Sequence, residues 1–148
     1  MIGILLLTHS FLGNAFIQAI EQLLGPQESL KAIDINGNFD HESKWTLFMD
    51  TIQSLDKGQG VLVLTDLFGS APSNLAIAGL GVGKIEVVVG VNLPMLLKVL
   101  ENRYRNTLDD LAELAKQAGR KDIKVASSLL IEDDNDVENH PSHQGISS

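Results

Sequence analysis

The sequence contains no cysteine and few aromatic residues. Of its 148 residues none is cysteine, and Phe, Trp and Tyr together make up 5%. The absence of cysteine excludes disulfide bonds, iron–sulfur clusters, thiolate zinc sites and cysteine nucleophiles. It fits a reducing compartment such as the cytoplasm. The shortage of aromatic rings disfavours the stacking platforms that bind single-stranded nucleic acids.

Long apolar runs and clusters of basic residues are also lacking. The apolar run at residues 4–7 is far shorter than the ~20 residues of a membrane-spanning helix. The chain begins Met1-Ile2-Gly3 without a basic stretch, so we expect no signal peptide. Lys and Arg number 11 against 19 Asp and Glu, which gives a formal net charge of −8. Because contacts to nucleic-acid phosphates need clustered Lys and Arg, we expect neither nucleic-acid binding nor insertion into a membrane.

The remaining composition is typical of one folded domain with an acidic end. At 148 residues the chain has the usual length of one domain, and its hydrophobic share of 44% suffices for one core. The stretch 132–148 holds Glu132, Asp133, Asp134, Asp136 and Glu138 but no Lys or Arg. We therefore expect a domain over residues 1–131 and a disordered acidic tail over residues 132–148.

Four short apolar runs alternate with segments that have helical spacing. The runs expected as buried strands are residues 2–8, 30–35, 60–65 and 84–91. The expected helices are residues 12–24 and 41–57, two that begin near Pro72 and Pro94, and one at 108–118. Strands that are continuously apolar are typical of a parallel sheet covered on both faces. The order therefore predicts an α/β domain, a doubly wound mostly parallel sheet with helices on both faces.

Capping signals set several of the expected helix ends. Gly25 should end the first helix, and Asp40 should be the N-cap of the second. Thr107 should cap the last helix, with Gly119 as its C-terminal stop. Residues 122–130 are expected to form a last strand.

Two chemically active side chains follow strands in this pattern. His9 comes at the end of the first expected strand, and Asp66 directly follows the third. Ligands of doubly wound sheets bind beyond the carboxyl ends of the strands, where the strand order reverses. We therefore expect the two strands to be adjacent and the two side chains to be in contact.

A histidine beside a carboxylate supports three kinds of chemistry. His9 could act as general base for Ser10 or Ser70, but the Gly-x-Ser-x-Gly motif is absent. Metal ligation by His9, Asp66 and His41 lacks a paired-histidine helix motif. A phosphoryl-accepting histidine needs a neutral ring nitrogen, a carboxylate that fixes the tautomer, and helix amino ends that stabilise phosphoryl oxygens.

Structural interpretations of the same residues stay open at this point. His9 could be a structural residue at a strand end, Asp66 could cap the following helix, and Gly69 could be only a turn residue. A second functional class is a flavodoxin-like domain that binds a small anion over these loops without covalent chemistry. The other histidines are expected to be solvated: His41, His140 and His143.

Four segments of the chain form a specific set when taken in order. They are residues 4–10 (Ile-Leu-Leu-Leu-Thr-His-Ser), 23–25 (Leu-Leu-Gly), 63–69 (Val-Leu-Thr-Asp-Leu-Phe-Gly) with Pro72 and Asn74, and 90–96 (Gly-Val-Asn-Leu-Pro-Met-Leu). On this fold the set resembles the IIA component of the mannose-family bacterial phosphotransferase system. The resemblance covers roughly residues 1–130, so the expected domain over residues 1–131 would be a mannose-type EIIA domain.

The resemblance implies a phosphocarrier without metal or cofactor. His9 would accept a phosphoryl group from phospho-HPr, forming a phosphohistidine intermediate, and pass it to a separate IIB protein in a sugar phosphotransferase system. Asp66 would pair with His9, and the chain would be a cytoplasmic homodimer. In the family the last strand can run antiparallel at the sheet edge and can be exchanged between subunits, which residues 121–130 would do here.

One loop departs from the family pattern. Family loops often place a hydroxyl directly before the proline, whereas this chain reads Ser70-Ala71-Pro72. The expected phosphate-binding residues are Ser10, Gly69, Ser70 and Ala71, with backbone N–H groups taking the part of the displaced hydroxyl. A regulatory phosphotransfer subunit without sugar transport would use the same carrier chemistry, so that alternative stays open.

Overall fold

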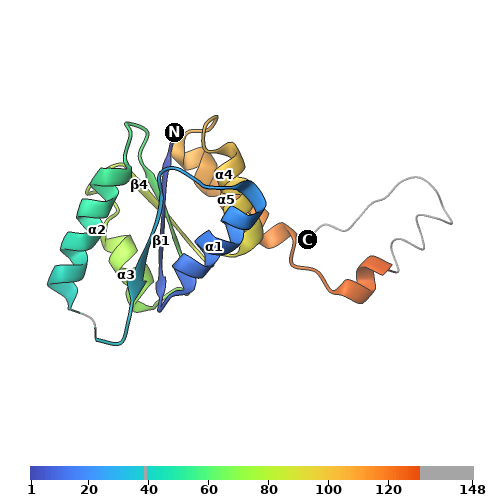
Figure 1. Ribbon diagram of the computed structural model, residues 1–148, viewed down its shortest axis with the longest axis horizontal. Coiled ribbons are helices and arrows are strands. Elements are labelled where there is room, and N and C mark those ends of the chain that lie inside the picture. The colour runs from blue at the N-terminus through green and yellow to red at the C-terminus, as the bar shows by residue number, and fades with distance from the viewer. Residues whose placement is uncertain (39, 131–148) are drawn as a thin grey trace.

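The four strands form one parallel sheet. The computed structural model describes residues 1–38 and 40–130 (Figure 1). The strands are β1 (Gly3–His9), β2 (Leu30–Ile35), β3 (Val61–Thr65) and β4 (Ile85–Val89). Their order across the sheet is β2-β1-β3-β4, and every neighbouring pair is parallel. The predicted doubly wound α/β fold is thus confirmed, and the strand order reverses between β1 and β3.

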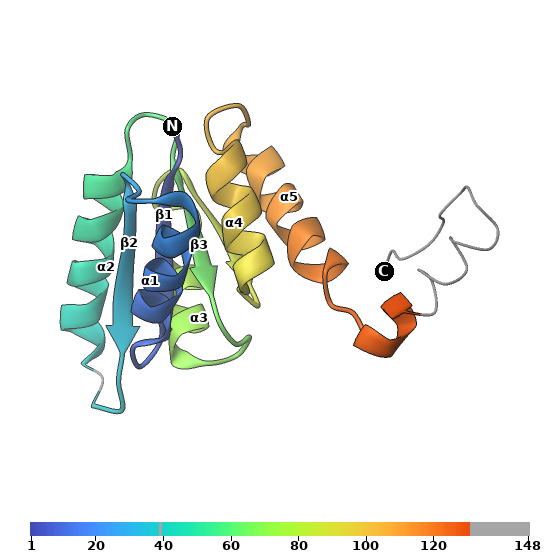
Figure 2. The ribbon, with the colours of Figure 1, turned by 45° about the vertical axis from the view of Figure 1, so that its right-hand side comes forward.

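Helices cover both faces of the sheet. Figures 1 and 2 show α2 (His41–Leu55) and α3 (Ala71–Ala78) on one face. The other face carries α1 (Leu12–Leu24), α4 (Leu93–Asn102) and α5 (Leu108–Lys121). Within β3, Leu62 and Leu64 pack in the core under α1, α4 and α5, whereas Val61 and Val63 pack in the core under α2 and α3. Burial of both faces explains why the strands are continuous apolar runs.

Several predicted helix ends are confirmed. Gly25 follows the last residue of α1 with a φ of 80°, a conformation that glycine adopts without strain. Thr107 caps α5, because its Oγ1 accepts a hydrogen bond from the backbone N–H of Asp110 at 3.2 Å. Asp40 occupies the N-cap position of α2, but its side chain makes no capping hydrogen bond.

The prediction that Gly119 ends the last helix is wrong. α5 continues through Gly119 to Lys121. A Cβ at position 119 would lie 2.7 Å from the Cε of Met95, so the glycine lets α5 approach α4 closely. The side chain of Asn92, the N-cap of α4, donates a hydrogen bond to the carbonyl of Gly119 at 2.8 Å. Gly119 thus serves helix packing rather than helix termination.

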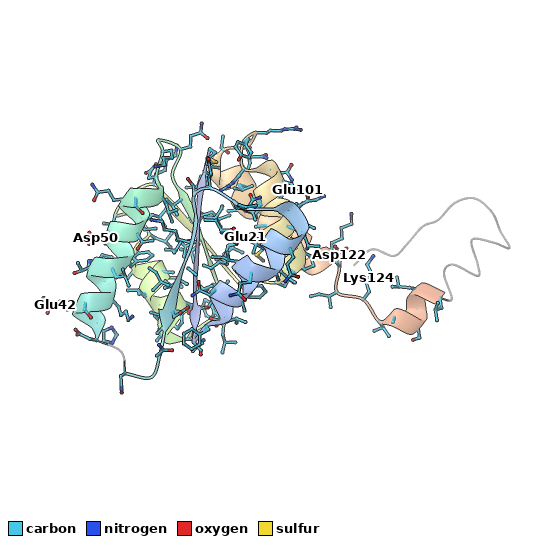
Figure 3. The ribbon with its side chains drawn as sticks, in the orientation of Figure 1. Glu21, Glu42, Asp50, Glu101, Asp122 and Lys124 are labelled. Atoms are coloured by element: carbon cyan, nitrogen blue, oxygen red, sulfur yellow. The ribbon has the colours of Figure 1, made fainter. Side chains whose placement is uncertain are left out.

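The predicted last strand over residues 122–130 is not formed. Residues 123–125 have no regular structure, and residues 126–130 are helical. The chain leaves the body of the domain after α5, with Asp122 and Lys124 beyond the end of that helix (Figures 1 and 3). In the structure this segment pairs with no strand of its own chain, and Ile123 and Val125 are 70% and 69% exposed. The expected acidic tail, residues 132–148, lies outside the described residues.

Candidate functional site

His9 and Asp66 meet at the point where the strand order reverses. His9 is the last residue of β1, and Asp66 directly follows β3, its parallel neighbour. Nδ1 of His9 lies 2.9 Å from Oδ2 of Asp66. The backbone N–H of His9 donates to the same oxygen, also at 2.9 Å. The carboxylate thus holds both the main chain and the ring of His9.

Asp66 is held in its ionised form. Partial burial opposes ionisation, but the hydrogen bonds from the backbone N–H and the ring of His9 and the attraction to that ring outweigh it. The pKa of the Asp66 carboxyl is therefore lowered from its usual value. Oδ1 also accepts a hydrogen bond from the N–H of Leu67 at 2.9 Å. At neutral pH the group is a carboxylate whose two oxygens are both engaged.

The ionised carboxylate determines which nitrogen of His9 carries the proton. A carboxylate only accepts hydrogen bonds, so Nδ1 must be the donor to Asp66. In the neutral ring the lone pair then lies on Nε2. The His9 side chain is 49% exposed, against 12% for Asp66. The site therefore presents one oriented, accessible nitrogen to solvent.

The turn after β1 fixes the position of His9. Ser10 has a φ of 48°, an uncommon conformation for a residue other than glycine, and its N–H donates to the carbonyl of Ile35 at 3.0 Å. Oγ1 of Thr8, fully buried, accepts from the N–H of Gly13 at 2.7 Å. Sequence analysis missed the role of Thr8; a hydroxyl at the end of an apolar strand was its signal.

The loop after β3 leads into α3. Gly69 has a φ of 83°, and Ser70 is the N-cap of α3. The hydroxyl of Ser70 donates to the carbonyl of Leu67 at 2.6 Å, so its hydrogen is already engaged. Ser73, which sequence analysis missed, accepts from the N–H of Ser70 at 3.1 Å and donates to its carbonyl at 3.0 Å. The Ser-x-x-Ser spacing was the available signal.

The expected phosphate-binding residues lie in the two loops that carry His9 and Asp66. Ser10 directly follows His9. Gly69 and Ser70 precede α3, and Ala71 is its first residue. Backbone N–H groups in the first turn of a helix have no acceptor within the helix and favour anions. Because both the hydroxyl hydrogen and the backbone N–H of Ser70 are engaged, the donors that this loop can offer are backbone N–H groups such as those of Gly69 and Ala71.

Large exposed apolar side chains directly follow both members of the polar pair in the chain. The structure exposes 67% of Phe11, 42% of Leu12, 63% of Leu67 and 76% of Phe68. We call these four residues the apolar rim. Two follow His9 in the chain and two follow Asp66. Exposed apolar residues grouped around polar ones are typical of protein-binding surfaces. Sequence analysis did not single out this rim, although large apolar residues in loops were its signal.

The described residues do not form the serine-nucleophile or metal sites that were considered from the sequence. Neither Ser10 nor Ser70 has a hydrogen bond to His9, whose Nδ1 is bonded to Asp66. No group of three metal-binding side chains occurs in residues 1–38 and 40–130. His41 lines a separate pocket of about 430 Å³ with Trp45 and Asn74, between α2 and α3. The positions of His140 and His143 lie outside the described residues.

The helices that the structure describes include none that is both long and apolar enough to cross a membrane.

A family model and individual relatives of this chain all point to the same protein family. A family model, EIIA-man, described as the PTS system fructose IIA component, matches residues 3–116. The chain is 33% identical over 134 residues to the PTS system mannose-specific EIIAB component of Escherichia coli (strain K12), which covers 88% of this chain and 41% of that protein. It is 28% identical to the PTS system fructose-specific EIIA component of Bacillus subtilis (strain 168), over 88% of this chain and 90% of that protein.

A solved structure shows the same fold over most of the chain. The phosphotransferase system component EIIA from Streptococcus agalactiae superposes with a TM-score of 0.78 and 25% sequence identity. The match covers 86% of this chain and 99% of the other. By contrast, the chain spans only about two fifths of the mannose-specific EIIAB proteins that it matches.

Proposed function

The chain belongs to the EIIA-man family of phosphotransferase-system components, and on that premise we propose that His9 carries a phosphoryl group from phospho-HPr to a separate IIB protein. The chain is an EIIA component of a sugar phosphotransferase system. The observation that carries the proposal is the contact between His9 Nδ1 and the ionised Asp66 at 2.9 Å, which leaves Nε2 accessible.

The transfer step follows from the orientation of the His9 ring. The lone pair of Nε2 attacks the phosphorus of phospho-HPr, a nitrogen–phosphorus bond forms, and the bond to the donor residue breaks with its electron pair leaving on the donor. The proton on Nδ1 stays in its hydrogen bond to Asp66. The ring becomes more positive as the bond forms, and the carboxylate stabilises that charge. In the second transfer a residue of the IIB protein attacks the phosphorus, and the nitrogen–phosphorus bond breaks with its electron pair returning to Nε2 of His9.

The loops around His9 support binding of the transferred group. Phosphoryl transfer depends mainly on positioning and on stabilising negative oxygens. Ser10, Gly69, Ser70 and Ala71 are proposed to surround the phosphoryl group, with backbone N–H groups at the start of α3 as donors. No metal or cofactor is required in this proposal.

The apolar rim supports binding of two protein partners in turn. Both the donor and the receiver must bring a reactive side chain to the same atom, Nε2 of His9. The four exposed apolar side chains of the rim follow His9 and Asp66 within three residues in the chain, a composition that suits burial against another protein. We place this exchange in the cytoplasm, with phospho-HPr as donor and the IIB protein as receiver.

The working form is proposed to be a homodimer. β4 lies at the edge of the sheet, so one side of its backbone has no neighbouring strand among the described residues. Val87, Val88 and Val89 line a groove of about 400 Å³ between β4 and α5. The exposed segment 123–130 carries apolar residues that a single chain leaves in water. We propose that in the dimer this segment, which is helical over residues 126–130 in the single chain, becomes extended and pairs with β4 of the other subunit as an antiparallel strand.

Phosphorylation in a reconstituted system tests the proposed function. The protein is incubated with phosphoenolpyruvate, enzyme I and HPr, and its intact mass is measured. We expect a gain of one phosphoryl group that is labile in acid and stable in base. His9→Gln should abolish the gain, and the matched variant His41→Gln should retain it. A flavodoxin-like binding domain would show no covalent gain with active donors, and that result would overturn the proposal.

A further inference from the structure

Another pocket lies at the end of the molecule opposite the His9 site. It has a volume of about 330 Å³, at the small end of the ~300–1,000 Å³ range of ligand sites. Its walls come from the turn between α4 and α5, from the chain before β3 and from the chain before β4, which Figures 1 and 2 show at the amino ends of the strands. We call it the amino-end pocket. The proposed phosphoryl transfer does not use it.

The charged side chains that line the amino-end pocket are both basic. Lys84 and Arg105 line it, and neither forms an ion pair with any residue that the structure describes. Lys84 also lines a neighbouring pocket together with Asp50 and Asp56, whereas Glu21 and Glu101 lie on α1 and α4 (Figure 3). Asp109, in the first turn of α5, lines the groove beside β4 instead. Two unpaired cations at one concavity repel each other and favour an anion.

Packing against Gly60 fixes the stem of Lys84 at the edge of the pocket. Gly60, buried with a φ of 89°, lies beneath the stem of Lys84, and a Cβ there would lie 2.8 Å from Lys84 Cγ. The carbonyl of Lys84 also accepts a hydrogen bond from the N–H of Val61 at 3.0 Å. Only a residue without a side chain fits this contact, so Gly60 permits the lysine stem to pack here.

The turn between α4 and α5 supplies an aromatic ring and polar groups. Tyr104, 63% exposed, lies against the guanidinium of Arg103 at 5.6 Å from its ring centroid. Arg103 is itself fixed by hydrogen bonds to the carbonyls of Ser29 and Glu28 at 3.1 and 2.6 Å. The amide nitrogen of Asn106 donates to the carbonyl of Asn102 at 2.8 Å, which leaves its oxygen as an acceptor for a ligand.

We propose that the amino-end pocket binds a small sugar phosphate. Lys84 and Arg105 would hold the phosphate, because ammonium and guanidinium groups form the strongest hydrogen bonds to phosphate oxygens. The Tyr104 ring suits the apolar face of a sugar, and the oxygen of Asn106 and the side chain of Gln59 suit its hydroxyl groups. Sugar phosphates are the product class of a sugar phosphotransferase system, so the pocket would let this component sense product.

Binding to the full chain tests this proposal directly. Amide chemical shifts are followed by NMR while glucose 6-phosphate is added. We expect saturable shifts at the backbone amides of Gln59, Lys84 and Arg105. Lys84→Gln and Arg105→Gln should each weaken binding by about tenfold or more, the usual effect of losing one charge-assisted hydrogen bond. The matched variant Lys98→Gln, exposed on α4 and outside the pocket, should bind as the unchanged chain does.

Three further binding experiments determine which class of ligand the pocket takes and whether binding is independent of phosphoryl transfer. Glucose alone should give no saturable shifts, and inorganic phosphate should bind more weakly than glucose 6-phosphate. The His9→Gln chain should bind glucose 6-phosphate unchanged, so that failure of phosphoryl acceptance and failure of this pocket are distinguishable. Equal binding of inorganic phosphate, absence of shifts at the pocket, or unaltered binding by the Lys84 and Arg105 variants would each overturn the proposal.

Discussion

The carboxylate of Asp66 orients His9 as well as lying beside it. One of its oxygens receives both the backbone N–H and the ring nitrogen of His9, and the other receives the N–H of Leu67. A residue that holds the main chain and the side chain of its partner restricts the ring to one orientation.

Asp66→Asn should slow transfer from phospho-HPr by about 10²–10⁴-fold, the range seen when an acid–base partner is lost. The amide removes the charge that stabilises the developing positive ring, and it no longer requires Nδ1 to be the donor. The reaction is stopped at a series of times, and the fraction of phosphorylated chain at each time, determined by mass spectrometry, gives the rate. The matched variant is Asp34→Asn, a carboxylate at the end of β2 that binds Asn14 and not His9, and it should leave the rate near that of the unchanged chain. Equal rates for both variants would contradict the role of Asp66.

The lowered pKa of Asp66 predicts a pH dependence of stability. The pKa is lower in the folded chain than the ~3.9 of an unfolded aspartate, so ionised Asp66 stabilises the fold above about pH 4. That contribution is lost as the pH falls through the folded value. The difference in free energy of unfolding between the unchanged chain and Asp66→Asn, measured in urea, should be constant near neutrality and shrink in acid. If the difference in free energy of unfolding stays the same down to acid pH, the pKa of Asp66 is not lowered in the folded chain.

The sequence indicates where His9 and Asp66 lie but not which groups hold them in place. The strand-end positions of His9 and Asp66 follow from pattern alone, because parallel strands end at one edge of a sheet. The sequence does not indicate that the hydroxyl of Ser70 donates a hydrogen bond to the carbonyl of Leu67. Such local hydrogen bonds depend on the loop conformation, which residue spacing does not specify.

Most elements are predictable from the sequence, and the exceptions are the end of α5 and the segment after it. The bounds Leu30–Ile35 and Leu12–Leu24 agree with the apolar and helical patterns. Gly119 was misread because glycine serves both helix ends and close helix contacts, and only the distance to Met95 distinguishes them. The segment after α5 was misread because its apolar residues suit a strand, but a strand also needs a neighbour.

The contact between β1 and α2 depends on Gly3. A Cβ at this position would lie 2.5 Å from the carbonyl oxygen of Leu55, a backbone atom that can move only with the end of α2. Gly3→Ala should therefore lower the free energy of unfolding by about 1–3 kcal/mol, the usual cost of overpacking. The matched variant Gly37→Ala, with no atom within 4 Å of the new Cβ, should change stability little. Urea denaturation measures the free energy of unfolding of both variants. If Gly3→Ala leaves that free energy unchanged, the close contact with Leu55 is wrong.

At the scale of the whole molecule, the exposed segment after α5 is the feature that a single chain leaves unexplained. Ile123, Val125 and Leu130 are each about two thirds exposed or more, while β4 has an unpaired edge. Exposed apolar residues and an open strand edge in one chain can satisfy each other across two chains. Sequence alone could suggest this exchange only through the family resemblance, because pairing between subunits leaves no pattern within one chain.

Two truncations separate the contribution of this segment from that of the residues after it. A chain that ends at Leu130 should remain a dimer, because it keeps the apolar segment. A chain that ends at Lys121 should be a monomer with an intact sheet. Light scattering after size-exclusion chromatography gives the masses. If the shorter chain is still a dimer, or the full chain is a monomer, the proposed exchange is wrong.

Identifying the phosphorylated atom tests the proposed carrier role of His9 most directly. The chain is labelled with ¹⁵N in its histidine rings and phosphorylated by phosphoenolpyruvate, enzyme I and HPr, and the coupling between phosphorus and ring nitrogen is measured by NMR. Because Asp66 holds Nδ1 of His9 at 2.9 Å, the account predicts that the phosphoryl group is on Nε2 of His9. A phosphoryl group on Nδ1 of His9, or on any other histidine, would contradict it.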